Sequence, residues 1–299
     1  MPSYRNLAVL AVLLLASCGA VRVSKSSEAN KLPWPEPDAK QAEALKAELK
    51  KDLDGTFAIS SLGPWIIATD MEPPEARRIT QNTMAVCAAG IQRQLFTKKA
   101  RSEPAKVYLF KDGDSYNSWN RKIFGEKPAS YFGYFSRAHN SLVMNIGTGG
   151  GTLVHEMVHA MAEADFPSIP AWLNEGLGSL YEACSTQPDG KVIGVVNWRL
   201  KGLQEDLKNN SATQLDALIG MSDTDFYSDE RKGSNYAAAR YFMQWMQDQG
   251  KLEAFYMRIR DKKDAGPKES LLKVFGGKMT LAEIQTKVFE WVKTLRVRG

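Results

Sequence analysis

The segment TLVHEMVHAMAE, residues 152–163, decides the fold around it because its pattern is that of a helix with one apolar side. Residues four apart on an α-helix lie about 40° apart around the axis and about 6 Å apart along it. The imidazoles of His155 and His159 therefore point to the same side. Apolar side chains at positions 154, 157, 158 and 161 form the opposite side. We expect this helix to pack on one side and to hold a metal ion on the other.

Glu156 lies between the two histidines, on the same side of the expected helix. The order His-Glu-x-x-His supplies two zinc ligands and a general base, which is the HExxH pattern. The chain has only three histidines and two are in this pattern, so chance is a weak explanation. His139, the third, lies among polar residues of an expected turn and is interpreted as exposed. The pattern predicts one zinc ion per chain, bound by His155 and His159.

Glu175 is the candidate for the third ligand. Pro170 favours the start of a second helix, and Glu175 lies about one turn into it. His159 lies about one turn before the end of the first helix, so an antiparallel helix pair would bring the two side chains together. Gly176 and Gly178 would let the second helix approach the first closely.

Several segments resemble known zinc peptidases. PAWLNEGL, residues 170–177, resembles the second motif of the gluzincins, the clan of thermolysin-like and aminopeptidase-like enzymes. GVVNWRL (194–200) and YAAAR (236–240) are similar in order and spacing to a bacterial gluzincin-like family, domain-of-unknown-function family 1570 (peptidase MA-like). The resemblance covers roughly residues 55–295 and is most specific in the HExxH and LNEG segments. It implies a small zincin core followed by a helical subdomain.

Two other carboxylates compete with Glu175 for the third ligand position. Asp165 is the tenth residue after His155, where metzincin-like enzymes place their last ligand, but those enzymes turn the chain at a glycine where Ala162 stands here. Glu163 lies two turns along the same helix and is better interpreted as a surface carboxylate. The geometry of a helix pair and the role of glutamate in zinc sites favour Glu175.

The predicted function is hydrolysis of peptide bonds by a gluzincin-type zinc metallopeptidase. Zinc would activate a bound water, and Glu156 would take the water's proton and deliver it to the leaving amine. The resemblance to aminopeptidase-like gluzincins implies Tyr236 as the donor to the oxyanion. Packing of Tyr236 with Tyr241 and Trp245 is the structural alternative. The strand expected over residues 141–146 would be an edge strand that pairs with a peptide substrate.

Two alternative functions use the same residues. The first is a non-catalytic envelope lipoprotein, a binding or assembly module with a vestigial or structural zinc site. Ser179 favours it, because thermolysin-like sequences carry at this position an Asp that orients a zinc-bound histidine, whereas an intact Glu156 argues against it. The second is metal-dependent hydrolysis of a non-peptide envelope component.

The stretch GTGGG, residues 147–151, lacks the ending of a phosphate loop and is interpreted as a flexible link.

The first residues predict export and lipid anchoring. Arg5, an apolar run over residues 7–16 and small residues after it are typical of a secretory signal. Leu15-Ala16-Ser17-Cys18 resembles the bacterial lipobox, in which the cysteine is acylated and attaches the chain to the membrane. Gly19 after this cysteine favours the outer membrane, facing the periplasm. We expect a protein of the bacterial cell envelope with a peptide or protein substrate.

The remaining composition is less specific. The net charge of +5 is mild, and the basic clusters are short and lack interleaved aromatic residues, so no nucleic-acid partner is expected. Cys87 and Cys184 could oxidise outside the cytoplasm. A disulfide and two separate thiols both stay open, because the sequence does not give the distance between them.

The order of elements predicts an α+β fold: a small mixed sheet with the HExxH helix, zincin-like, and then a mostly helical C-terminal subdomain. The expected parts are a signal peptide (1–17), a tether (18–37), an α+β subdomain with the HExxH helix (38–164) and a helical subdomain that supplies the third ligand (165–299). Helices are expected over 42–53, 73–96 and 115–124, and strands over 56–60, 65–69, 106–110, 131–135 and 141–146. From residue 152 onward the pattern is almost wholly helical.

Overall fold

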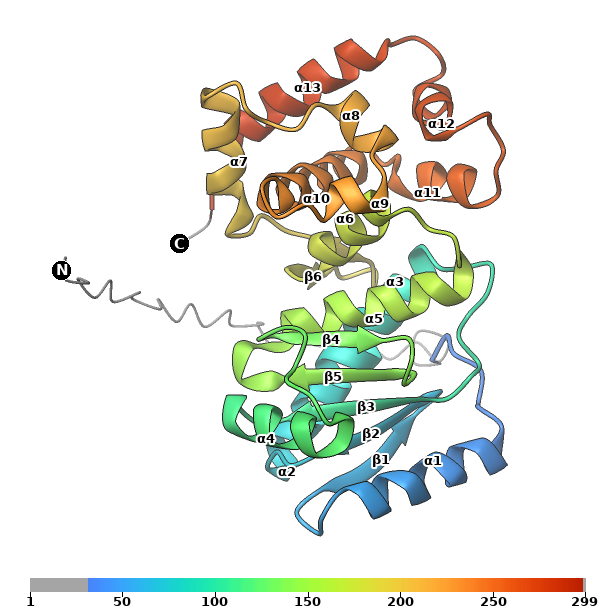
Figure 1. Cartoon of the computed structure of the whole chain (residues 1–299). Helices are drawn as coiled ribbons and strands as arrows, with labels where there is room; N and C mark the ends of the chain where they lie inside the picture. Colours follow the sequence, from blue (N-terminus) through green and yellow to red (C-terminus); the bar gives the residue numbers. More distant parts are fainter. Residues whose placement is uncertain (1–31, 298–299) are drawn as a thin grey trace, which may run out of the picture. The chain divides into compact units, whose positions relative to one another are not determined.

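A mixed sheet of five strands precedes the helical part in the structure, a computed structural model that describes residues 32–297 (Figure 1). The strand order is β1-β2-β3-β5-β4, in which β2, β3 and β5 are parallel and the two outer strands are antiparallel to their neighbours. The bounds agree with the expected strands to within two residues: β1 (Ala58–Leu62), β2 (Trp65–Thr69), β3 (Ala105–Phe110), β4 (Gly133–Ser136) and β5 (Ser141–Asn145).

Helices cover both faces of this sheet because its inner strands are apolar on both sides. Val107 and Leu142 are paired across β3 and β5 and belong to the larger core cluster, together with residues of α5 (Gly150–Asp165). Tyr108 and Val143, the next pair, point to the other face. There they pack with residues of α1 (Ala39–Asp52) and α4 (Gly113–Phe124). The sheet therefore separates α5 from α1 and α4.

The helical segment expected over residues 73–96 consists of three consecutive pieces. They are α2 (Pro73–Arg78), a π-helical stretch η1 (Ile79–Ala88) and α3 (Ala89–Gln94). The extent of the segment was predicted and its π geometry was not, because apolar spacing alone does not distinguish the two kinds of turn. η1 packs against α5 and against the short strand β6 (Cys184–Thr186). The segment therefore reaches both the sheet layer and the helices beyond it.

α5 lies between the sheet and the helical C-terminal part (Figure 1). Its neighbour α6 (Ala171–Tyr181) is buried at every residue except Asn174, and α6 packs in turn against α10 (Lys232–Asp248). The described chain is thus mixed α and β with a helical C-terminal part, as expected. The other helices are η2 (Ile146–Thr148, a 3₁₀ turn), α7 (Arg199–Lys208), α8 (Leu215–Gly220), α9 (Asp223–Phe226), α11 (Leu252–Arg260), α12 (Pro267–Val274) and α13 (Leu281–Thr294).

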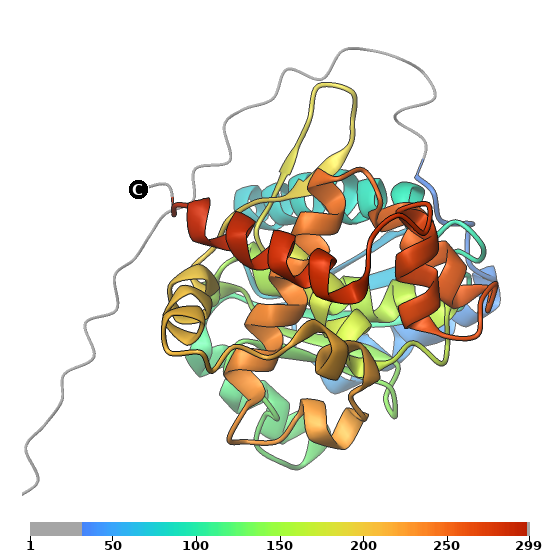
Figure 2. The ribbon, with the colours of Figure 1, turned by 90° about the horizontal axis from the view of Figure 1, so that it is seen from above.

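A β-hairpin interrupts the region that was expected to be almost wholly helical. It pairs β6 with β7 (Val192–Gly194), and its turn projects beyond the neighbouring helices (Figure 2). The local signal was present in the sequence. Asp189-Gly190 is a turn-forming dipeptide between short β-branched segments, and Gly190 adopts a φ of +83°. The helical interpretation of this stretch was therefore wrong.

The edge strands of the sheet are β1 and β4, not the strand over residues 141–146, so the expected edge strand was wrong. β5 pairs with β3 on one side and β4 on the other, and all five of its residues are buried. The sequence predicted the hairpin of β4 and β5 but not which of its strands joins β3. The burial of β5 follows from its place inside the sheet, whereas β4 is buried only at Gly133.

The predicted signal peptide, the acylated Cys18 and most of the predicted tether lie outside the described residues. Trp34 lies within the expected tether but is buried, with its ring against Trp65 and its indole N–H donated to Gln92. Packing thus begins before the expected boundary at residue 38. Among residues 32–297, no helix combines the length and the apolar character needed to cross a bilayer.

Candidate metal centre

Three side chains from α5 and α6 converge at the interface of these helices. His155 Nε2 lies 3.2 Å from Glu175 Oε2, and His159 Nε2 lies 3.5 Å from the same oxygen. One ligand atom from each residue lies within 4.8 Å of the others, and no other group of this kind occurs in the described part of the chain. His155 and Glu175 are buried and His159 is half-buried. The structure therefore brings together the three residues that the sequence singled out as zinc ligands.

Of the two glycines expected to let α6 approach α5, only Gly178 faces that helix, whereas Gly176 faces α10. A Cβ on Gly178 would lie 2.9 Å from His155 Nε2, closer than real Cβ contacts come. A Cβ on Gly176 would lie 3.0 Å from Met243 Cγ and 3.2 Å from the carbonyl oxygen of Ala239, both in α10. Gly178 thus makes room for a ligand, while Gly176 makes room for the helix packed behind α6.

The second nitrogen of each imidazole has a partner of its own. His155 Nδ1 lies 3.3 Å from Glu182 Oε2, and His159 Nδ1 lies 3.0 Å from Asn174 Oδ1. With Nδ1–H donated to these oxygens, each ring presents Nε2 to the shared centre. A buried oxygen that fixes the tautomer and orientation of a histidine is the usual support of a metal ligand.

Glu182 was missed by the sequence analysis, which looked for such a carboxylate at Ser179. Ser179 is fully buried, and its hydroxyl has no hydrogen-bond partner among the described residues. Glu182 lies at the C-terminal cap of α6, where it also accepts from Arg199 Nε at 2.8 Å and from Asn197 Nδ2 at 2.7 Å. Its spacing of seven residues from Glu175 places it on the same side of α6, but its contact with His155 depends on how α6 crosses α5.

The charges of the site stabilise one another. Burial opposes the ionisation of Glu175, but His159 and His155 outweigh it and hold the pKa of Glu175 well below its usual range. Burial likewise disfavours the two imidazolium ions, but the neighbouring glutamates raise the pKa of both histidines. The pKa of Glu182 is lowered to about 2, because its bonds to His155 and Arg199 outweigh its burial. These carboxylates thus favour positive charge at the point where the imidazoles meet.

Two tyrosines lie beside the Glu175 carboxylate. Tyr227 donates its hydroxyl to Glu175 Oε1 at 2.7 Å, and the phenol of Tyr236 lies near the same carboxylate. Burial and this carboxylate raise the pKa of both phenols. The ring of Tyr236 contacts Phe226 and Tyr227, so the alternative packing with Tyr241 and Trp245 is not the arrangement observed. Tyr227 was missed, since nothing in its local sequence distinguishes it.

Glu156 hydrogen-bonds to the sheet and is not part of the ligand group. Its Oε2 accepts the backbone N–H of Phe135 in β4 at 2.9 Å. This bond attaches the candidate general base to the edge strand of the sheet. Glu156 is half-buried and close enough to favour the charged form of His155. It is therefore beside the candidate centre and is not one of its three ligands.

The two rival carboxylates have other partners. Asp165 Oδ1 accepts the backbone N–H groups of Lys98 and Lys99, and its Oδ2 accepts from Tyr256 and Arg260. These bonds fix Asp165 as a structural residue at the end of α5. Glu163 pairs with Arg137 at 3.0 Å. Neither belongs to the ligand group, and the third histidine, His139, is exposed as expected.

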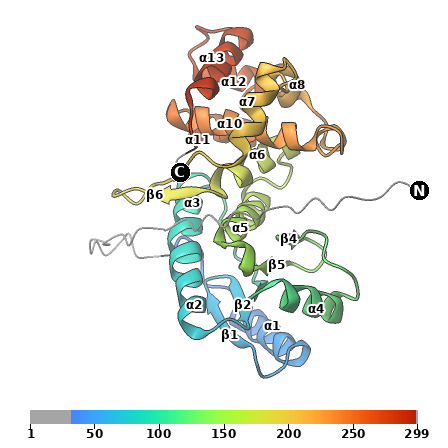
Figure 3. The ribbon, with the colours of Figure 1, turned by 90° about the vertical axis from the view of Figure 1, so that its left-hand side faces the viewer.

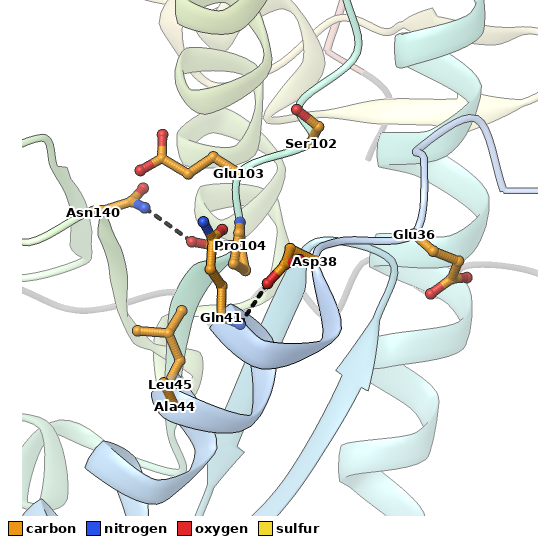
Figure 4. Close-up of a pocket in the computed structure, with 9 residues that line it drawn as sticks. All are labelled: Glu36, Asp38, Gln41, Ala44, Leu45, Ser102, Glu103, Pro104 and Asn140. Carbon is orange, nitrogen blue, oxygen red and sulfur yellow. Dashed lines mark hydrogen bonds between the residues drawn. The ribbon is translucent and has the colours of Figure 1, made fainter.

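A separate hollow of about 600 Å³ lies beside the N-terminus of α1 (Figure 4). Its lining includes Glu36, Asp38 and Glu103, but none of the three candidate ligands. Asp38 is already engaged, because its carboxylate accepts the N–H of Gln41 as the cap of α1. The hollow is therefore distinct from the candidate centre.

The described chain thus has a candidate metal centre, made of two histidines and one glutamate, between the packed helices α5 and α6. Residues 150–267 match a family described as a protein of unknown function (DUF1570). The match begins at the first residue of α5 and ends in α12, so it contains all three candidate ligands. It is narrower than the resemblance over residues 55–295. A comparison with curated proteins finds no match.

Proposed function

We propose that the chain is a zinc-dependent metallopeptidase of the gluzincin type. The observation that carries the proposal is the convergence of His155 Nε2, His159 Nε2 and Glu175 Oε2, with a separate partner on each Nδ1. Two imidazoles and a carboxylate are a donor set that suits zinc, and three protein ligands are typical of catalytic sites. When bound at such a site, zinc polarises a carbonyl and lowers the pKa of water.

Glu156 supports catalysis rather than a purely structural site. A structural centre needs no carboxylate next to its ligands, whereas hydrolysis needs a group that moves a proton. The bond from Phe135 N–H orients Glu156 without consuming its second oxygen. We assign Glu156 the transfer of a proton from the attacking water to the leaving amine. Tyr236 and the newly identified Tyr227 are the candidates for stabilising the oxyanion, since both phenols reach Glu175.

The edge strand β4 suits an extended peptide substrate. Its Phe135 N–H points away from β5, toward the edge of the sheet, and donates there to Glu156 of α5. A peptide that adds to this edge would bind through its backbone and lie next to the candidate base. We therefore assign to β4 the pairing with a peptide substrate that the sequence analysis had assigned to the strand over residues 141–146.

The competing hypothesis of a non-catalytic module loses its main argument. That argument was the absence of an orienting carboxylate at Ser179, and Glu182 supplies one from another position. Anchoring in the bacterial envelope through Cys18 remains our proposal for the location of the protein.

The test combines metal analysis with proteolysis of a peptide library. We expect about one zinc per chain and cleavage of peptides, and Glu156→Gln should retain zinc while hydrolysis falls by at least ~10²-fold. Glu163→Gln is the matched control on the same helix, because Glu163 pairs with the exposed Arg137 and not with a candidate ligand. A metal-supplemented protein that binds no zinc would sink the proposal. Wild type that binds zinc and cleaves nothing across the library would favour the binding module.

A further inference from the structure

Two cysteines far apart in the sequence come together beside the candidate centre. Cys87 lies in η1 and Cys184 begins β6, and these elements pack against each other (Figure 3). Cys87 Sγ lies 4.0 Å from Thr186 Oγ1. Alternate residues of a strand share a face, so Cys184 and Thr186 are on the same side of β6. Cys87 therefore faces the side of β6 that carries Cys184.

The two thiols interact directly, and the structure describes them as thiols rather than as a disulfide. A hydrogen bond between the two sulfurs, together with Thr186, outweighs burial and lowers the pKa of Cys87 to about 7. A thiol with such a pKa is partly thiolate near neutral pH, and the thiolate is the nucleophile in disulfide exchange. Both cysteines are half-buried rather than enclosed in the core, which leaves access for a small oxidant.

The surroundings of Cys184 connect it to the metal site. Cys184 follows Glu182, the partner of His155 Nδ1, by two residues. The backbone there is already held on one side, since a Cβ on Gly151 of α5 would lie 2.2 Å from the carbonyl oxygen of Glu182. A bond from Cys184 to η1 would hold the same segment from the other side. The orientation of His155 would then depend on a backbone fixed at two points.

We propose that Cys87 and Cys184 are a redox pair that forms a disulfide between η1 and β6. The oxidant is a disulfide of the glutathione or dithiol-protein class. The Cys87 thiolate attacks one sulfur of this disulfide and releases the first thiolate of the oxidant. The Cys184 thiolate then attacks Cys87 Sγ in the mixed disulfide and releases the second. Two protons and two electrons leave the cysteine pair, and the oxidant becomes two thiols.

The consequence for stability follows from the position of the two cysteines. The chain between residues 87 and 184 contains His155, His159 and Glu175. A disulfide that closes a loop of this length strongly restricts the unfolded chain and so stabilises the folded one. For a chain of this size, we expect Tm to rise by on the order of 5–10 °C. The inference concerns the cysteines alone and does not require the chain to be a peptidase.

The test uses the full chain treated with oxidised glutathione, alkylated and digested with trypsin. We expect the peptide of residues 79–93 to be linked to the peptide of residues 138–191, with a mass two hydrogens below their sum. Full-length Cys18→Ser should give the same linked species, which excludes a bond that involves Cys18. Cys87→Ser should carry glutathione on Cys184 instead. Separate glutathione adducts on Cys87 and Cys184 of the wild type, or links only to Cys18, would overturn the proposal.

Thermal unfolding gives the second readout. The oxidised wild type should unfold at a higher temperature than the reduced wild type, whereas Cys87→Ser should show no such difference. Amide hydrogen exchange at residues 183–186 should be slower in the oxidised protein. Equal exchange in both forms would show that the disulfide does not fix the segment next to Glu182. If Cys87→Ser does not fold, the peptide link and the Tm of wild type before and after reduction still decide the question.

Discussion

Replacing Glu182 by Gln tests whether this residue orients His155. The change keeps the size of the side chain and removes the charge that faces His155 Nδ1 at 3.3 Å and Arg199 Nε at 2.8 Å. Losing such a partner of a metal-binding histidine weakens metal binding by about 10–100-fold. The pKa of Glu182 falls from 4.5 to about 2, which corresponds to roughly 3 kcal/mol in favour of the carboxylate. Because glutamine keeps an acceptor oxygen, we expect a loss of about 1–3 kcal/mol of stability.

The two effects are measured separately. Zinc affinity is obtained by competition with a chromophoric chelator, and stability by thermal unfolding with EDTA, where each kcal/mol shifts Tm by about 2–4 °C in a chain of this size. Glu163→Gln is again the control, since it removes a carboxylate from α5 without touching a ligand. A Glu182→Gln protein that is destabilised as expected but binds zinc as tightly as wild type would refute the orienting role.

The same residue gives a pH dependence with a definite sign. A carboxyl group whose pKa is lowered on folding contributes stability above its ordinary pKa and loses it as the pH falls through the folded value. For Glu182 the contribution is present above pH 4.5 and disappears toward pH 2. Urea unfolding of the metal-free protein between pH 2 and 6 should therefore show a shallower loss of stability in Glu182→Gln than in wild type. Parallel curves for the two proteins would contradict this assignment.

Four further substitutions test the third ligand, the oxyanion donor and the anchor. Glu175→Gln should weaken zinc binding by far more than Asp165→Asn. Asp165→Asn should leave zinc affinity nearly unchanged but lower Tm, because Asp165 is buried against Arg260. The reverse ranking by metal titration would favour a metzincin-like centre. Tyr236→Phe should reduce peptide hydrolysis by ~10²-fold or less, and less than Glu156→Gln does, since one donor to the oxyanion is lost; equal losses in kcat would contradict these roles. Cys18→Ser should release the protein from the membrane or leave it unprocessed; unchanged sedimentation with membranes would refute lipid anchoring.

Much of the candidate site could be predicted because its residues follow local periodicity. His155, His159 and Glu156 are fixed by the spacing of one helix, and Glu175 by the start of the next. Tyr227 could not be found in this way, because it reaches the centre from a position that depends on how several helices cross. Glu182 follows Glu175 by seven residues on the same side of α6, but the sequence does not show that this side faces His155.

The sheet shows the same division between local and non-local information. Short apolar runs bounded by turn residues predicted five strands to within two residues of their ends. The order β1-β2-β3-β5-β4 depends on which strand of the last hairpin meets β3, and this choice changed the identity of the edge. The β6–β7 hairpin is a different case, because Asp189-Gly190 was a local signal that was overlooked next to strongly helical neighbours.

One helix face explains why the centre has its observed composition. Glu175, Gly178 and Glu182 are spaced three and four residues apart, so they lie in one stripe along α6 and its cap. The ring of His155 lies across this stripe, with Nε2 toward Glu175 and Nδ1 toward Glu182. The position between them faces the middle of the ring, where a Cβ would come within 2.9–3.0 Å of its atoms. A ligand, a glycine and an orienting carboxylate at these three positions therefore act as one unit, and a change at any of them should move the same imidazole.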